Sequence, residues 1–134
     1  MERDYFTPTL TEAEVRAMGS LALAHVGDAV FELMVRLHLA SAVTKNGSLH
    51  RAAVGMVNAK AQAGDMERLL PLLSGEEAEV FRRGRNVKVH SVPKHATPGD
   101  YHAATGLEAL FGYLYLMGRR ERLNALFAAI VEEN

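Results

Sequence analysis

The chain has 134 residues, the length of one ordinary domain, and its hydrophobic fraction of 49% is enough for an apolar core. It contains no cysteine, which excludes disulfides, cysteine-based zinc sites and thiol catalysis and fits a reducing compartment. The charged N-terminus does not resemble a signal peptide, and Asp28, Glu32 and Arg36 interrupt the most apolar stretch, residues 21–40. We therefore expect a soluble cytoplasmic protein with no membrane-spanning segment.

Helix signals dominate the first third of the chain, and no segment has the pattern of a strand. The pair Thr11 and Glu14 forms a capping box that begins a short first helix. Residues from about 19 to 41 predict a long helix that is apolar nearly all round, so we expect it to be the buried centre of the fold. A turn is expected at residues 45–47.

Shorter helices follow in the middle of the chain. Ser48 is a candidate cap for a helix that runs to about residue 63, and Gly64 with Asp65 should break or bend it. A short helix to residue 73 comes next. The pair Ser74 and Glu77 is a second capping box, and it begins a helix that ends near residues 84–86.

The last third begins with an irregular segment, residues 87–97. Thr97 and Pro98 are typical of a helix start, and Gly118 ends that helix after about residue 117. A final amphipathic helix covers about 119–132. These elements predict an all-α fold of about seven helices, in one domain over residues 1–134 with its core at about 19–132.

The net charge of −1 conceals an uneven distribution. No acid lies between Leu33 and Gly64 or between Val80 and Gly99, yet nine of the fifteen cations do. A basic face for nucleic acid and scattered solvated charge both remain open. The nine cations are Arg36, Lys45, Arg51, Lys60, Arg82, Arg83, Arg85, Lys88 and Lys94.

The long helix at 19–41 carries one polar stripe, because His25, Asp28, Glu32 and Arg36 follow one another at spacings of three, four and four. Glu32 and Arg36 are expected to form an ion pair. Asp28 has no cation three or four residues away and stands between two small residues. A charge on an apolar helix needs a partner or a metal, so Asp28 is a candidate functional residue.

A second isolated acid, Glu108, lies in the apolar helix at 98–117, with Thr105 three residues before it and Gly112 one turn after it. If the two apolar helices pack face to face, Asp28 and Glu108 converge and repel each other. A hard divalent cation such as Mg²⁺ would relieve that repulsion. A carboxylic acid pair, or a buried salt bridge to a base elsewhere, remains the alternative.

Two segments resemble the ribonuclease III family: residues 24–30, AHVGDAV, and residues 107–112, LEALFG. The resemblance extends over about residues 19–132. Within the family it is strongest to Mini-ribonuclease III, the branch without a double-stranded-RNA-binding domain. The larger enzymes carry carboxylates where this chain has Ala24 and Thr105, so only Asp28 and Glu108 transfer as catalytic and metal-binding residues.

The resemblance implies a homodimer that cuts double-stranded RNA with Mg²⁺, leaves 5′-phosphate and 3′-hydroxyl ends, and matures the ends of the 23S ribosomal RNA precursor. A ribosomal-protein helper is a further expected partner. Glu32 and Thr105 are candidates to complete the metal site. The apolar faces of the last two helices are candidate dimer surfaces, which core packing explains equally well. The residues expected to contact RNA are Lys60, Gln62, Arg82, Arg85, Asn86, Lys88 and Lys94.

Two other functions remain open. A helical module could bind structured RNA on the ribosome and cut it weakly or not at all, which Ala24 and Thr105 favour and the retention of Asp28 and Glu108 opposes. A protein-interaction domain with paired acids would show neither RNA binding nor a magnesium effect. A separate hypothesis is that residues 87–97 enter an RNA groove.

Overall fold

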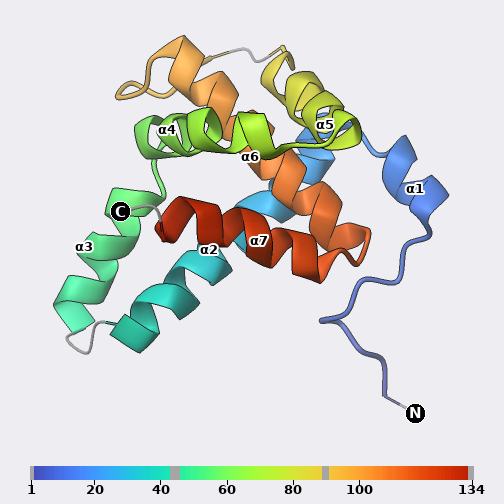
Figure 1. Cartoon of the computed structure of the whole chain (residues 1–134), viewed down its shortest axis with the longest axis horizontal. Coiled ribbons are helices and arrows are strands. Elements are labelled where there is room, and N and C mark those ends of the chain that lie inside the picture. Colours follow the sequence, from blue (N-terminus) through green and yellow to red (C-terminus); the bar gives the residue numbers. More distant parts are fainter. Residues whose placement is uncertain (1, 43–45, 89–90, 133–134) are drawn as a thin grey trace.

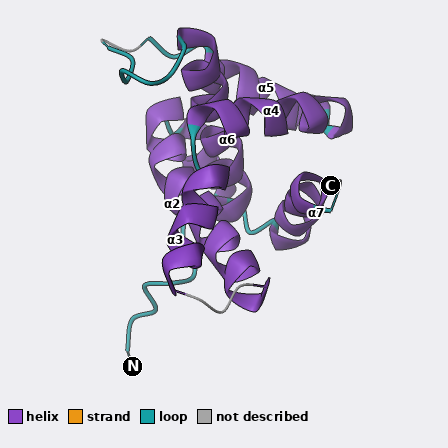
Figure 2. Cartoon of the chain, turned by 90° about the vertical axis from the view of Figure 1, so that its left-hand side faces the viewer, coloured by secondary structure: helices purple, strands orange, loops and turns teal. Residues whose placement is uncertain are grey.

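A computed structural model of the chain describes residues 2–42, 46–88 and 91–132, and in these ranges it contains helices and no strand, which confirms the all-α prediction (Figures 1 and 2). No described helix is long and apolar enough to cross a bilayer. The elements are α1 (Glu12–Ala17), α2 (Ser20–Ala42), α3 (Asn46–Met56), α4 (Ala59–Leu69), the 3₁₀ turn η1 (Leu70–Leu72), α5 (Gly75–Arg85), α6 (Pro98–Leu116) and α7 (Arg120–Val131).

Three of the expected helix caps, at Thr11, Ser74 and Thr97, are present. Both capping boxes form, because the Thr11 and Ser74 side chains accept hydrogen bonds from the backbone N–H groups of Glu14 and Glu77, whose side chains bond back. Thr97 caps α6, which has a proline in its first turn. Gly118 follows α6 with a φ of 73°, the left-handed conformation that glycine adopts at low cost.

The prediction of one helix over residues 48–63 is wrong. The chain breaks after Met56, where the Asn58 side chain accepts a hydrogen bond from the backbone N–H of Ala61 at 2.9 Å and donates one to the Val54 carbonyl at 3.0 Å. The side-chain amide of Asn58 therefore caps both the end of α3 and the start of α4. Ser48 lies within α3, Gly64 and Asp65 lie within α4, and part of the turn expected at 45–47 lies outside the described residues.

The most buried helix is α6, whereas the long helix α2 was expected in that place. α6 buries ten of its 19 residues and contacts α2, α4, α5 and α7, as its course through the middle of Figure 1 shows. α2 buries five of its 23 residues, among them Phe31, whose ring packs edge-on against Phe111 with the centroids 5.3 Å apart. The other apolar side of α2 is exposed, because no described element of the chain covers it.

Two glycines allow the backbones of α2 and α6 to touch. A Cβ atom on Gly27 would lie 1.6 Å from the carbonyl oxygen of Glu108, and one on Gly112 would lie 2.0 Å from that of Leu23. No larger residue fits at either position without moving the helices apart. This crossing places Asp28, next to Gly27, beside Glu108.

Candidate active site

The centre of the candidate site is the pair of carboxyl groups that α2 and α6 bring together. Burial and, second, the nearby charge of Asp28 raise the pKa of Glu108 from its ordinary 4.5 to about 8. In the described part of the chain, no group of three or more histidine and acidic side chains gathers that could hold a metal ion. The candidate site contains two carboxyl groups, those of Asp28 and Glu108.

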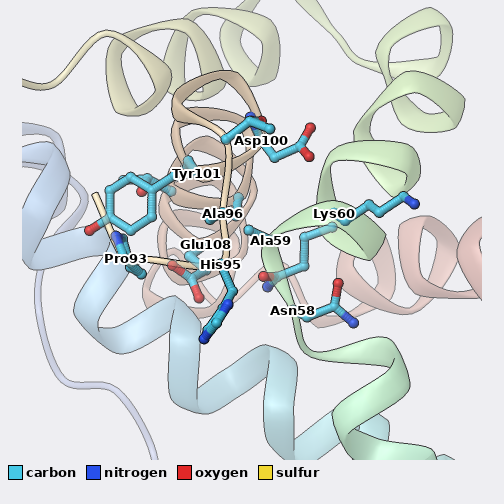
Figure 3. A pocket seen from close by; sticks show the side chains of 13 residues that line it. Asn58, Ala59, Lys60, Pro93, His95, Ala96, Asp100, Tyr101 and Glu108 are labelled. Carbon is cyan, nitrogen blue, oxygen red and sulfur yellow. The ribbon is translucent and has the colours of Figure 1, made fainter.

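Glu108 lies in a cleft of about 500 Å³ between α4, the segment 93–97 and the first half of α6 (Figure 3). Lys60 lines the cleft and is exposed. The complete lining is Asn58, Ala59, Lys60, Gln62, Pro93, His95, Ala96, Thr97, Asp100, Tyr101, Ala104, Thr105 and Glu108.

The two polar residues expected near Glu108 have different surroundings. Thr105 is 7% exposed, and its hydroxyl donates a hydrogen bond of 3.0 Å to the Tyr101 carbonyl within α6. Gln62, expected among the RNA contacts on the surface, is instead buried at 4% exposure, because α4 turns this side toward α6. Its carboxamide favours the ionised form of Glu108, a smaller effect on the pKa that opposes burial.

Glu32 forms the ion pair that its spacing from Arg36 predicts, with Arg36 Nη2 at 3.1 Å from Glu32 Oε1. Both side chains are largely solvated, at 40% and 65% exposure. Glu32 does not line the cleft that holds Glu108. A role for Glu32 at a metal ion stays a prediction.

The expected RNA contacts in the segment 82–94 are all exposed, and three of them are already engaged. Arg82 pairs with Glu79, with Nε at 3.0 Å from Oε2. Arg85 lies over the Phe81 ring at 5.5 Å and its Nε contacts the Asn86 side chain at 3.4 Å. Lys88 and Lys94 are exposed, so these two and Lys60 are the more accessible cations for a phosphate backbone.

A second cleft, of about 640 Å³, lies on the exposed side of α2, between the N-terminal segment and α7. Leu33 and Leu37, at 45% and 62% exposure, contribute to it. The other candidate dimer surfaces pack mostly in the core, since Leu123, Leu126, Phe127 and Ile130 of α7 and Tyr113 and Leu114 of α6 are buried. Tyr115 and Leu123 nevertheless also line this cleft, so a role of these two helices at an interface stays a prediction.

Sequence reasoning missed two residues that line the cleft together with Glu108, namely Tyr101 and His95. A signal existed for Tyr101, because it precedes Glu108 by seven residues, two turns of the same helix, and so shares its face. His95 lies in an irregular segment, where no periodicity in the sequence indicates which way a side chain points.

Comparison with known proteins identifies the class. Residues 21–119 match the ribonuclease III domain, and the chain belongs to that family. Like the family, it is an endoribonuclease.

The relatives narrow this to one branch. The chain is 46% identical over 113 residues to the Mini-ribonuclease 3 of Symbiobacterium thermophilum, covering 84% of this chain and 87% of the relative. It is 42% identical over 127 residues to that of a Thermoanaerobacter species, covering 94% and 89%. A crystal structure of protein FN1578 from Fusobacterium nucleatum superimposes with a TM-score of 0.80 at 28% identity, covering 89% of this chain and 96% of the other.

Proposed function

We propose that the chain is a magnesium-dependent endoribonuclease that cuts double-stranded RNA at a site formed by Asp28 and Glu108. Products would carry 5′-phosphate and 3′-hydroxyl ends. The observation that supports this most strongly is the apposition of the two carboxyl groups beside the contact of Gly27 with Gly112, where Asp28 is exposed and Glu108 lines a cleft open to a ligand.

The residues at the site fit Mg²⁺. Two carboxyl groups lie close enough that Asp28 hinders the ionisation of Glu108, so a cation between them removes an unfavourable interaction. Magnesium prefers one or two carboxylates and keeps places for water and phosphate oxygens, which a site with few protein ligands allows. When bound, the ion supplies positive charge that activates a water nucleophile and neutralises charge on the leaving oxygen.

The other residues of the site would bind and orient the RNA. Glu108, with a pKa of about 8, must lose its proton before it can act as a ligand. Lys60 at the cleft and the exposed Lys88 and Lys94 would contact phosphates on either side of the scissile bond. Arg82, Arg85 and Asn86 remain proposed RNA contacts that would first have to leave their present partners. Recognition would be of A-form shape, through phosphates and 2′-hydroxyls.

We also propose that two copies of the chain pair through the exposed apolar side of α2. Exposed leucines beside an open apolar cleft are typical of a protein interface. The family resemblance also implies a homodimer. Two copies would present two sites to one duplex, one for each strand. The proposed cellular substrate is the 23S ribosomal RNA precursor, with a ribosomal protein as helper. The cytoplasmic location stays a prediction.

The test is cleavage of an end-labelled RNA duplex by the wild type, Asp28→Asn and Glu108→Gln, with Mg²⁺ or with a chelator. Cleavage by the wild type alone, and only with Mg²⁺, supports the proposal. Duplex binding without cleavage by the wild type would instead support the RNA-binding module, for which the absence of carboxylates at Ala24 and Thr105 is the specific observation.

A further inference from the structure

The side chain of Gln62 has an unusual position. It is 4% exposed, and its Nε2 atom is buried without a hydrogen-bond partner among the described residues. Buried amide nitrogens are paired in nearly all folded proteins, since the loss of hydration is otherwise uncompensated. An unpaired buried donor in this cleft points to a partner among the groups that line it.

A carboxylate is a strong acceptor for an amide N–H, and Glu108 lines the same cleft as Gln62. The side chains of Gln62 on α4 and Asp28 on α2 both lie near this carboxyl group. The carboxyl group of Glu108 therefore lies between an amide on α4 and an acid on α2.

Two of the other donors that line the cleft, Thr105 and Lys60, do not replace Gln62. The Thr105 hydroxyl, one turn before Glu108, donates to the Tyr101 carbonyl instead. Lys60 is exposed, and Figure 3 shows its side chain extending away from Glu108. Of these three cleft donors, the Gln62 amide is buried and has a free hydrogen-bonding group.

The helix that carries Gln62 is held firmly. One turn further along α4, Asp65 accepts a hydrogen bond of 2.7 Å from Arg68 Nη2, which also reaches the Ile130 carbonyl in α7 at 3.5 Å. Asn58 caps the start of the same helix. The amide of Gln62 is thus presented to the cleft from a fixed backbone, as the positioning of a metal ligand requires.

We propose that Gln62 is a positioning residue for the metal site: its Nε2 donates a hydrogen bond to the ionised Glu108 carboxylate and holds it toward Asp28 as a ligand. This rests on the proposed magnesium site. Partners of this kind commonly change metal affinity by about 10- to 100-fold. The alternative role, direct binding of an RNA phosphate, would change the KM for RNA and leave metal affinity unchanged.

The experiment uses Gln62→Leu, which keeps the size of the side chain and removes its hydrogen bonds, beside Glu67→Gln as an exposed control on the same helix. Mn²⁺ binding to the RNA-free protein is followed by electron paramagnetic resonance, and Tm is measured in chelator. We expect about 10- to 100-fold weaker Mn²⁺ binding for Gln62→Leu. Its Tm in chelator should be unchanged or higher, because an unpaired buried donor is removed. The control should match the wild type in both measurements.

Cleavage adds a second readout. Gln62→Leu should need more Mg²⁺ for half-maximal single-turnover cleavage and should recover at high Mg²⁺. Unchanged Mn²⁺ affinity, or a lowered Tm in chelator, would overturn the assignment by showing an RNA-binding or a purely structural role. Asp28→Asn separates this failure from failure of the proposed function: if Asp28→Asn binds Mn²⁺ and cleaves as well as the wild type, the metal site itself is wrong.

Discussion

Replacing Glu108 with glutamine should stabilise the metal-free protein while it abolishes cleavage. Burial and Asp28 make the charged form of Glu108 unfavourable in the folded state, and a neutral amide of the same shape avoids this penalty. Because the pKa of Glu108 is raised on folding, the folded protein holds this proton more tightly than the unfolded chain. Wild-type stability in chelator should therefore fall as the pH rises from about 4.5 to about 8.

The size of the effect follows from that interval. At about 1.4 kcal/mol per pH unit, the step from 4.5 to about 8 corresponds to at most about 5 kcal/mol. Solvent in the open cleft screens the charges and reduces this to about 1–3 kcal/mol.

The assay is urea unfolding in chelator at pH 5 and pH 8. Glu108→Gln should match the wild type at about pH 5 and exceed it by about 1–3 kcal/mol at about pH 8. The control Glu67→Gln, on an exposed side chain, should change stability by less than about 0.5 kcal/mol at either pH. A variant less stable than the wild type at pH 8, or the same pH dependence in both, would refute the reasoning.

Four other substitutions test the helix contact, an ion pair and the proposed dimer surface. Gly112→Ala should lower the free energy of unfolding by about 3 kcal/mol and remove most of the activity, because it separates α2 from α6. Gly64→Ala, whose added methyl group meets open space, should raise the free energy of unfolding by about 0.5–1 kcal/mol. Thermal unfolding measures both changes. Glu77→Gln should cost about 2–4 kcal/mol at neutral pH by breaking the pair with Arg122. The Arg122 guanidinium lowers the pKa of Glu77 below its ordinary 4.5, so that difference should shrink in acid unfolding curves as the pH falls from 4.5 through the lowered pKa. Leu37→Glu should give monomers in sedimentation velocity without loss of helix content.

The paired acids could be predicted from the sequence because a carboxylate on an apolar helix is costly wherever the helix packs. Asp28 and Glu108 stand out for that reason, and Gly27 and Gly112 indicate the close contact that joins them. The caps at Thr11, Ser74 and Thr97 could also be predicted, because each depends only on residues within one helical turn, and all three form as expected.

What the sequence does not reveal depends on tertiary contacts. Gly64 resembles a helix end, yet α4 continues through it because the helix packs on α6 and because Asn58 already provides the break. Burial of Gln62 depends on which side of α4 meets α6. The apolar pattern of α2 does not show which side stays uncovered, so the buried centre was assigned to the wrong helix.

A double-mutant cycle tests most directly whether Asp28 and Glu108 form one catalytic site. Single-turnover cleavage of an RNA duplex in Mg²⁺ would be measured for the wild type, Asp28→Asn, Glu108→Gln and the double variant. Groups that act as a unit are strongly non-additive, so the double variant should cut no more slowly than the slower single variant. Losses that multiply in the double variant, or a single variant with the wild-type rate, would contradict a shared site.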